Sequence, residues 1–409
     1  MKDLISVLLV GIGGYGKNYF DELANNTNRS DYQIAAVVDP YAEKSPKIKE
    51  VRGRGIPVFS KMEDFYQEHT ADYVCISSPI QFHASQTVIA LDNGAGVICE
   101  KPLSATVQEG RKMLEAERES DRPVGIAYQW SFSQAIQLLK KDIIAGVFGK
   151  PLRLKTLVSW PRDIEYYKRN NWAGKKRDSG QWILDSVANN ATAHYLHNMF
   201  YVLGKEIEKS AWPVKLRAEL YRANDIDNYD TAAVRVFTEQ GVELLYLATH
   251  ASQEKINPRF SYEFEQAIIY FDQDKDCQIK AEFKDGRNKV YGDPFADKFN
   301  KIWTVLDAIK GEGSYLCGVE AALPHVICVN GMQESLPEIS NFPNELIEQD
   351  RDEDGRERGV YVKGLSKLFL DCYNNWQLPD ETEVHWTELG KEVDLTAYEY
   401  FPSGNYSAV

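Results

Sequence analysis

A glycine-rich turn near the start of the chain restricts the fold more than any other feature of the sequence. Residues 5–10 form an almost continuous apolar run, and Gly11-Ile12-Gly13-Gly14-Tyr15-Gly16 follows it directly. A buried strand, a G-x-G-x-x-G turn and a helix in this order are the fingerprint of a dinucleotide-binding fold. We expect Gly11 to permit the tight turn, Gly13 to admit a pyrophosphate, and Gly16 to let the helix pack on the strand.

An acidic residue ends the second predicted strand, residues 34–38. Asp39 follows the last glycine by roughly the 20 residues that the fingerprint requires. Its carboxylate would accept hydrogen bonds from the adenosine ribose hydroxyls and repel a 2′-phosphate, so the sequence favours NAD over NADP. The alternative is an ordinary strand-capping Asp behind a structural glycine turn.

The first third of the chain alternates apolar runs with helical segments. Further apolar runs lie at 73–76, 97–99 and 124–127, with helical patterns at 81–93 and 106–119. This alternation predicts an α/β fold, an N-terminal Rossmann domain with a doubly wound parallel sheet.

Beyond about residue 130 the pattern changes to consecutive strands. They are predicted at 152–159, 215–221, 231–238, 242–248, 260–270 and 278–283, with helices at 136–144, 186–203, 295–310 and 319–333. Such runs predict a C-terminal α+β domain with a large, mostly antiparallel open sheet. We therefore divide the chain into an NAD(P)-binding Rossmann domain, residues 1–127, and a substrate-binding and oligomerisation domain, residues 128–409. The charged run 345–359 is predicted to be a solvated loop.

Composition narrows the class of protein. The net charge of −14 argues against a nucleic-acid partner, because phosphate binding needs clustered Lys and Arg. No apolar run approaches the roughly 18 residues of a membrane-spanning helix. The six cysteines form no C-x-x-C pair, which favours reduced thiols and a cytoplasmic location over disulfides or zinc.

A polar cluster follows the fourth and fifth predicted strands. Ser78, Pro79 and His83 come after one strand, and Glu100-Lys101-Pro102 ends the next. Ligands of open parallel sheets bind at this edge, so Lys101 is a candidate catalytic residue. The alternative is a solvated lysine at a strand end.

These motifs together resemble the glucose–fructose oxidoreductase, inositol dehydrogenase and MocA-like family, with Glu100-Lys101-Pro102 the most specific element. The resemblance implies a cis peptide bond before Pro102. It also implies a second catalytic element, a helix with an Asp-x-x-x-His pattern and a further Asp three residues on. At those positions this chain has Asn190, His194 and His197, and Asp185 could replace the missing acid only if extra residues at the helix start folded back.

The expected chemistry is oxidation of an alcohol. His194 would accept the hydroxyl proton, Lys101 would stabilise the developing alkoxide, and Asn190 would orient the substrate or His194. A continuous helix would put Asn190, His194 and His197 on one face. His194 and His197 lack a third ligand, so no metal site is predicted.

The segment 160–172 is rich in aromatic and hydrogen-bonding residues that suit a polyhydroxylated ring, although an ordinary surface loop would explain it equally well. His250 is assigned no role. The predicted cofactor-binding residues are Gly11, Gly13, Gly14, Tyr15, Gly16, Asp39, Ser78, Pro79, His83, Glu100, Lys101 and Gln129. The predicted substrate-binding residues are Lys101, Tyr128, Arg162, Tyr167, Asn190, His194 and His197.

The sequence thus favours an NAD-dependent dehydrogenase that acts on a secondary hydroxyl of a sugar, inositol or related polyol. Two alternatives are a redox-neutral enzyme that uses tightly bound NAD transiently and a non-catalytic nucleotide sensor. An open sheet face is commonly buried by self-association, and the resemblance also implies a homodimer or homotetramer.

Overall fold

The computed structural model of the protein describes residues 4–403 and divides into two compact units. The first, the Rossmann unit, comprises Met1–Ser104, Glu109–Phe132 and Asp297–Leu323. The second, the sheet unit, comprises Ala105–Gln108, Ser133–Ala296 and Pro324–Val409. A division at residues 127 and 128 therefore leaves out the segment Asp297–Leu323, which packs with the Rossmann sheet.

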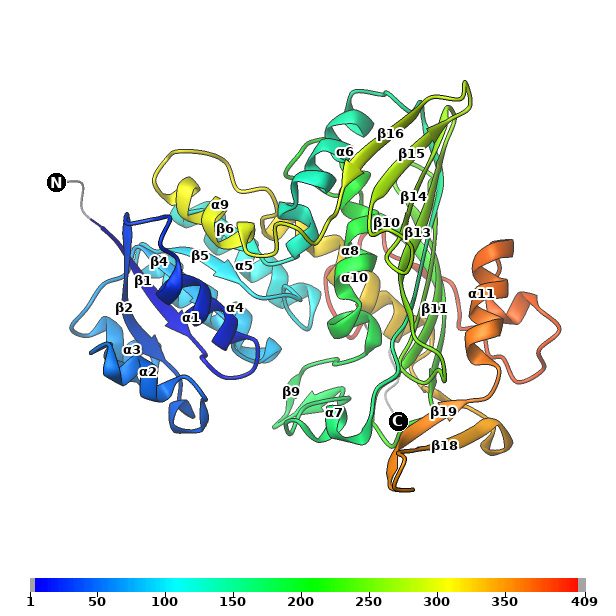
Figure 1. Cartoon of the computed structure of the whole chain (residues 1–409), viewed down its shortest axis with the longest axis horizontal. Helices are drawn as coiled ribbons and strands as arrows, with labels where there is room; N and C mark the ends of the chain where they lie inside the picture. Colours follow the sequence, from blue (N-terminus) through cyan, green and yellow to red (C-terminus); the bar gives the residue numbers. More distant parts are fainter. Residues whose placement is uncertain (1–3, 404–409) are drawn as a thin grey trace. The chain divides into compact units, whose positions relative to one another are not determined.

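The Rossmann unit contains the predicted parallel sheet (Figure 1). Its strand order is β3-β2-β1-β4-β5-β6, and every neighbouring pair is parallel. The order reverses between β1 and β4, where ligands of doubly wound sheets bind. The strands are β1 (Ile5–Val10), β2 (Tyr32–Val38), β3 (Val58–Phe59), β4 (Tyr73–Ile76), β5 (Gly96–Cys99) and β6 (Val124–Ile126). The helices are α1 (Gly16–Asn25), α2 (Ile48–Gly53), α3 (Met62–Tyr66), α4 (His83–Asp92), α5 (Val107–Ser120) and α9 (Asn300–Ile309), with short turns η1 (Ala42–Lys44), η2 (Ile80–Phe82) and η3 (Gln129–Phe132).

Helix α9 completes the Rossmann unit from far along the chain. Two glycines of the sheet make room for it: a Cβ at Gly96 would lie 2.5 Å from Ile309 Cγ1, and one at Gly125 would lie 2.4 Å from Val305 Cγ2. Figure 1 shows α9 (yellow) beside β5 and β6. Strands β5 and β6 therefore each have a glycine, without a side chain, at the point where this helix packs.

The sheet unit is built on a ten-stranded, mostly antiparallel sheet, as predicted. The strand order is β16-β15-β14-β13-β7-β12-β11-β10-β17, with β20 beside β10. Only β7 with β12 and β10 with β17 pair in parallel. The strands are β7 (Pro151–Ser159), β10 (Pro213–Arg222), β11 (Thr231–Thr238), β12 (Glu243–Thr249), β13 (Ile256–Phe264), β14 (Ala267–Asp272), β15 (Ile279–Phe283), β16 (Asn288–Gly292), β17 (Ser340–Asn341) and β20 (Val393–Asp394). The predicted single strand 260–270 is instead the β13–β14 hairpin, because the chain turns at Glu265 and Gln266.

The remaining elements of the sheet unit are helices and two small ribbons. The helices are α6 (Gln134–Ile144), α7 (Ile164–Lys168), α8 (Ala193–Val202), α10 (Val319–Ser335, which begins in the Rossmann unit) and α11 (Leu365–Asn375), and the short turns are η4 (Val187–Ala191), η5 (Asn344–Leu346) and η6 (Pro379–Glu381). The ribbons are β8 (Arg177–Asp178) with β9 (Gln181–Trp182), and β18 (Ile347–Arg351) with β19 (Glu357–Val362). The charged run 345–359 is thus largely a β-hairpin and not the expected loop.

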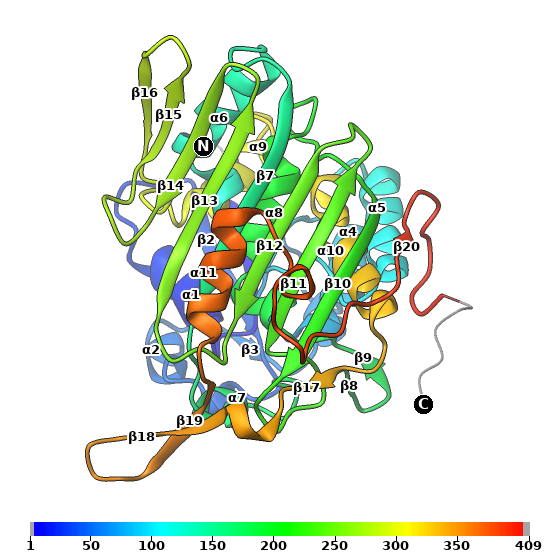
Figure 2. The same ribbon diagram turned by 90° about the vertical axis from the view of Figure 1, so that its right-hand side faces the viewer.

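Both faces of the large sheet are covered over its central strands. On one face Tyr246 of β12 reaches Thr192, which precedes α8. On the other face lies α11 (Figure 2), and Leu245 and Leu247 belong to an apolar cluster with its Phe369 and Cys372. The chain's own C-terminal segment therefore covers the central strands of this face.

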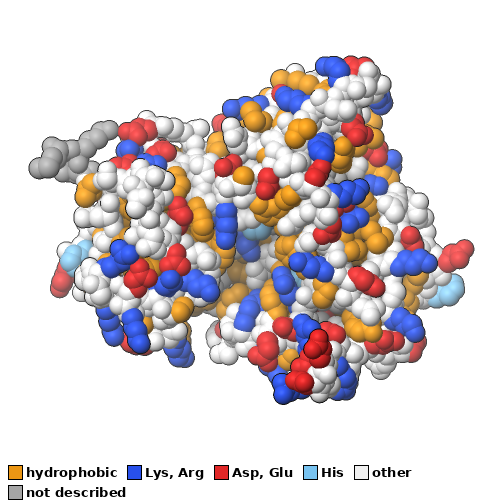
Figure 3. All heavy atoms as spheres, viewed as in Figure 1, with side chains coloured by type: hydrophobic (Ala, Val, Ile, Leu, Met, Phe, Trp, Pro, Cys, Tyr) orange, Lys and Arg blue, Asp and Glu red, His pale blue; other side chains and the backbone are white. Residues whose placement is uncertain are grey.

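Charge is spread over the surface without a dominant basic region on the face seen in Figure 3, where Lys and Arg alternate with Asp and Glu. None of the helices within residues 4–403 combines the length and apolarity needed to span a lipid bilayer.

Candidate cofactor and substrate sites

The glycine-rich turn is packed tightly on one side and open on the other. Gly11 has a φ of +83°, and a Cβ there would lie 3.0 Å from Ser77 O. A Cβ at Gly16 would lie 2.2 Å from Gly11 O, so both positions require glycine. A Cβ at Gly13 or Gly14 would meet no atom within 4 Å. The open side leaves the backbone accessible, which fits an approaching pyrophosphate at the start of α1.

Asp39 holds the same turn from the end of β2. Its Oδ2 accepts from Ile12 N at 3.0 Å, and its Oδ1 accepts from Tyr41 N at 2.8 Å. Ser45 Oγ donates to Ile12 O at 2.7 Å from the other side. A carboxylate offers about four acceptor sites, so Asp39 retains capacity for ribose hydroxyls while it fixes the loop.

His83 connects the turns that follow β4 and β5. Its Nδ1 lies 2.8 Å from Pro102 O and its Nε2 lies 3.0 Å from Ser78 O. Burial lowers the pKa of His83. Ser78 Oγ donates to Gln86 Oε1 at 2.5 Å. His83 thus lies behind the turns and ties them together, and its predicted contact with the cofactor stays a prediction.

Glu100 lies at the centre of a buried polar network beside Lys101. Its Oε1 accepts from Tyr19 OH at 2.9 Å and forms an ion pair with Lys301, while its Oε2 accepts from Lys101 N at 3.3 Å. Burial alone would raise the pKa of Glu100, but Lys301 and Lys101 hold it below its usual value. The Lys101–Pro102 peptide bond is cis, as expected.

Lys301 was missed by the sequence analysis. A signal was present, because Lys301 stands four and eight residues before Val305 and Ile309, the apolar face with which α9 packs on the sheet. Tyr128 is wholly buried in the same unit, and the neighbouring Gln129 is partly exposed.

In the sheet unit, the expected continuous helix 186–203 is interrupted. Residues Val187–Ala191 form a π-helical turn, and α8 begins only at Ala193. The extra residue in that turn brings Asp185 back to Asn190, whose Nδ2 donates to Asp185 Oδ1 at 2.7 Å. Asp185 is 3% exposed and also accepts from Gly174 N at 2.7 Å. The buried carboxylate of Asp185 is therefore hydrogen-bonded to the side-chain amide of Asn190.

The two histidines of α8 differ in environment. His194 is partly exposed, and its ring meets Tyr195 edge to face at 6.4 Å. His197 is buried and stacks on Tyr201 at 5.5 Å. Burial, together with His325 and Lys140, lowers the pKa of His197 well below its usual value. His194 is thus the more accessible base of the two, whereas His197 packs in the core as a neutral ring.

The aromatic segment after β7 is folded against the end of β12. The Arg162 guanidinium lies 4.7 Å from the centre of the Tyr166 ring, and that ring meets His250 edge to face at 5.6 Å. His250 Nδ1 is 2.8 Å from Trp160 O and therefore carries the proton that it donates. This leaves His250 Nε2 as a buried acceptor with no hydrogen-bond partner among the described residues. The sequence analysis had assigned no role to His250.

A cavity of about 1110 Å³ lies beside this segment, within the sheet unit. Tyr167, Asn171, Lys175, Asp225 and Glu357 are among the residues that line it. Its lining combines apolar with polar and charged side chains, a composition that suits a polyhydroxylated ligand.

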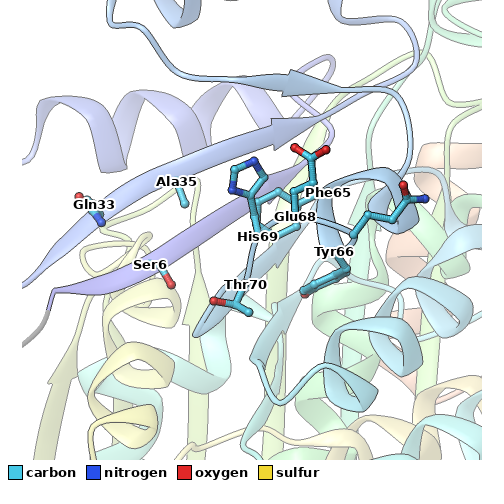
Figure 4. A pocket seen from close by; sticks show the side chains of 9 residues that line it. Ser6, Gln33, Ala35, Phe65, Tyr66, Glu68, His69 and Thr70 are labelled. Atoms are coloured by element: carbon cyan, nitrogen blue, oxygen red, sulfur yellow. The ribbon is translucent and has the colours of Figure 1, made fainter.

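A smaller cavity of about 590 Å³ lies in the Rossmann unit (Figure 4). Ser6 and Gln33, near the starts of β1 and β2, line it together with the segment 65–70. It is thus at the amino ends of the strands, whereas Gly11, Ser77 and Glu100 follow their carboxyl ends. Nowhere in residues 4–403 do three or more His, Cys, Asp or Glu side chains gather so as to hold a metal ion.

Comparison with known proteins identifies a family that the Rossmann part of this chain matches. Residues 5–128 match the GFO_IDH_MocA family model, described as an oxidoreductase family with an NAD-binding Rossmann fold. Inositol 2-dehydrogenase of Corynebacterium glutamicum is 29% identical over 188 residues, which are 46% of this chain and 52% of that protein. The rhizopine catabolism protein MocA of Rhizobium meliloti is 29% identical over 152 residues, 37% of this chain and 46% of the relative. The match thus spans about half the length of these curated relatives.

The fold extends further than the sequence match. The WlbA dehydrogenase of Bordetella pertussis, solved in complex with NADH and UDP-GlcNAcA, superposes with a TM-score of 0.67 at 19% identity. The superposition covers 82% of this chain and 97% of that structure. The two-sheet architecture is therefore shared over most of the chain.

Proposed function

Because the Rossmann domain of this chain belongs to the glucose–fructose oxidoreductase, inositol dehydrogenase and MocA-like family, we propose that the protein oxidises a secondary hydroxyl of a sugar, inositol or related polyol with NAD. The observation that carries the proposal is the fixed turn at the end of β5. Glu100 is buried and bonded there, and it holds the backbone of Lys101 at the edge where ligands of parallel sheets bind.

The cofactor would lie against the open side of the glycine turn. Gly13 and Gly14 leave room there, and the first N–H groups of α1 favour a pyrophosphate. Asp39 would accept from the ribose hydroxyls, and its negative charge disfavours a 2′-phosphate, which supports NAD over NADP. When bound, NAD supplies the hydride acceptor.

The protein's own groups would handle the proton and the developing charge. His194 would take the hydroxyl proton, because imidazole titrates near neutrality. Lys101 would donate to the same oxygen and stabilise its negative charge. Asn190 would orient the substrate, and its bond to Asp185 fixes the direction of its amide.

The segment after β7 supports a polyhydroxylated substrate. Arg162 and Tyr167 bring charged and aromatic surface, and the cavity that Tyr167 lines adds several hydrogen-bonding groups. Sugar rings stack their C–H faces on aromatic rings while their hydroxyls bind fixed polar groups. His197, buried in the core, is the weakest member of the predicted substrate set.

The test is NADH formation by the purified protein with NAD and a panel of sugars, inositols and sugar acids. Lys101→Ala and His194→Ala are expected to abolish turnover, while Lys391→Ala, at an exposed position, serves as the matched control. A polyol oxidised by wild type and the control but by neither variant supports the proposal. No oxidation of any compound, despite NAD binding, rejects it.

Two other uses of the site give different results in the same experiment. A redox-neutral enzyme would convert its substrate without net NADH, and a sensor would bind NAD with no reaction at all.

The six free cysteines support the proposal that the protein acts in the cytoplasm. The predicted homo-oligomer remains a proposal.

A further inference from the structure

The larger cavity, which belongs wholly to the sheet unit, is built by three segments that are far apart in the sequence. Residues within 164–175, the turn 223–227 between β10 and β11, and three residues of β19 line it. The hairpin β18–β19 packs closely on the first segment, because a Cβ at Gly359 would lie 3.2 Å from Arg162 O. Figure 2 shows β19 beside α7. The C-terminal part of the chain therefore supplies one wall of this cavity.

The backbone behind the cavity is bound to the carboxylate that holds Asn190. Gly174 has a φ of +71°, and a Cβ there would lie 2.7 Å from Ile226 Cγ2 and 3.3 Å from Tyr167 Cδ1, two apolar groups of the lining. Gly174 N donates to Asp185 Oδ2 at 2.7 Å, and Asp185 Oδ1 accepts from Asn190 Nδ2 at 2.7 Å. Asp185 therefore joins the apolar wall of the cavity to the amide that is proposed to orient the substrate.

Size and charge restrict what the cavity can hold. Its volume of about 1110 Å³ exceeds the roughly 300–1,000 Å³ of most pockets for drug-sized ligands, so a single sugar ring would leave much of it empty. Two cations and three carboxylates line it, namely Lys168, Lys175, Asp225, Asp227 and Glu357. The excess of negative charge disfavours a phosphate or carboxylate ligand. An uncharged ligand that has many hydroxyls and is larger than one ring therefore fits best.

The polar side chains of the lining fall into two kinds. Asn170 Oδ1 accepts from Trp172 N at 3.1 Å and from Ala173 N at 2.8 Å, so it shapes the wall itself. By contrast, the side chains of Asp225 and Glu357 form no hydrogen bond or ion pair with any residue between 4 and 403. Carboxylates in this state are acceptors for the hydroxyls of a ligand.

We propose that this cavity is the subsite for a second, uncharged sugar ring, so that the substrate is a disaccharide or another glycoside. The inference rests on the proposed function and names its substrate class. The ring that is oxidised would lie at Asn190 and His194, and the other ring would pack on Tyr167 and Ile226. One secondary hydroxyl of the first ring becomes a carbonyl: its carbon gives a hydride to NAD, its oxygen gives the proton to His194, and the glycosidic bond stays intact.

The hairpin allows the subsite to be filled without any change to the catalytic groups. Glu357 and Arg358 are exposed neighbours on β19, but only Glu357 is part of the cavity lining. Successive side chains of a strand point to opposite faces. Glu357→Trp therefore places an indole in the cavity, and Arg358→Trp places the same group on the other face of the strand as the matched control.

The experiment measures kcat/KM for NAD reduction by wild type and both variants. The substrates are single-ring sugars and inositols, the neutral disaccharides maltose, cellobiose, lactose and trehalose, and the anionic compounds glucose 1-phosphate and UDP-glucose. The best disaccharide should exceed the best single-ring compound by about tenfold or more, because binding of the remote ring stabilises the transition state. Glu357→Trp should remove most of this advantage, and Arg358→Trp should keep it. If Glu357→Trp does not fold, as judged by Tm, Asp225→Trp fills the cavity from the turn 223–227 and replaces it.

Three results overturn the inference. They are a single ring oxidised as well as every disaccharide, a disaccharide advantage that is equal in Glu357→Trp and wild type, and a preference for the anionic compounds over the neutral disaccharides. Calorimetric titration of the disaccharides in the presence of NAD separates this outcome from failure of the proposed function. Disaccharide binding that Glu357→Trp weakens, without oxidation of any compound, supports the sugar subsite and rejects the proposed oxidation.

Discussion

Asn190 donates a hydrogen bond to Asp185 across the π-helical turn that precedes α8, with 2.7 Å between Nδ2 and Oδ1. Asp185 is in turn held by Gly174 N and lies 3.6 Å from the Arg169 guanidinium. The carboxylate thus occupies a fixed position behind the amide that is proposed to orient the substrate.

Replacement of Asp185 tests this relationship. Asp185→Asn keeps the volume but removes the charge, and a charge-assisted hydrogen bond contributes about 1.5–3 kcal/mol. We expect kcat/KM for the active polyol to fall by at least about tenfold, with NAD affinity unchanged. Glu353→Gln, an exposed acid in the sheet unit, is the control. Equal kcat/KM in Asp185→Asn and wild type would contradict the role given to the pair.

Asp39 is expected to determine the cofactor. In Asp39→Asn the negative charge that disfavours a 2′-phosphate is lost, and so is a charged acceptor for Ile12 N. NAD binding should weaken by about tenfold, equivalent to about 1.4 kcal/mol, and NADP binding should weaken less or improve. Isothermal titration with both cofactors measures the ratio, and a ratio equal to that of wild type would refute the assignment.

His250 should make stability depend on pH. Burial and the nearby Arg162 lower its pKa from 6.5 to about 3 in the folded protein. The unfolded chain therefore binds a proton below about pH 6.5 that the folded chain excludes until about pH 3, so stability falls as the pH falls through that window. Between pH 7 and pH 5 the expected loss is about 2 kcal/mol.

The measurement is urea unfolding of wild type, His250→Gln and His385→Gln at both pH values. His385 is exposed, so its variant should behave like wild type. The loss between pH 7 and pH 5 should be smaller in His250→Gln by about 2 kcal/mol, and an equal loss in all three would exclude His250 as its source.

Replacement of Phe369 tests how much the packing of α11 on the large sheet contributes to stability. The side chain is wholly buried in the apolar cluster with Leu245 and Leu247. Phe369→Ala should lower the free energy of unfolding by about 3–5 kcal/mol, whereas Lys367→Ala, exposed on the same helix, should change it by less than about 0.5 kcal/mol. Light scattering on the same samples reports whether the loosened cover promotes self-association. A loss of stability below about 1 kcal/mol in Phe369→Ala would mean that α11 contributes little.

The Rossmann sheet could be predicted because its signals are local. Residues 7–10 and 73–76 are buried on both faces and so form apolar runs, and the glycine turn follows the first run directly. Asp39 and Lys101 follow strand ends, where the family pattern places them.

Other features depend on residues that are distant in the sequence. Nothing near Gly96 or Gly125 indicates that α9 will pack against them, so the division at residues 127 and 128 left that helix out. Within the hairpin β18–β19, Gly359 and Val362 are buried and the other residues are exposed or half-buried, so its sequence lacks the apolar alternation of a half-buried strand.

The prediction from helical periodicity was wrong at the start of the predicted helix 186–203. The spacing of Asn190, His194 and His197 assumes 3.6 residues per turn, but the π-helical turn contains an additional residue. The sequence does contain the acid, Asp185, that this turn brings back to Asn190. The sequence analysis could only say that Asp185 replaces the missing acid if the helix start folds back, because the sequence does not reveal which helical turn contains the additional residue.

The late position of α9 in the chain has a consequence for biosynthesis. A ribosome that has made residues 1–132 has translated every strand of the parallel sheet, yet the helix that packs on the glycines of β5 and β6 is still to be translated. During that interval Glu100 has no Lys301, and Tyr73 OH has no Ile302 carbonyl to which it can donate. The nucleotide-binding half is therefore expected to mature only after most of the second half has emerged, so the two halves are not independent modules in the order of their synthesis.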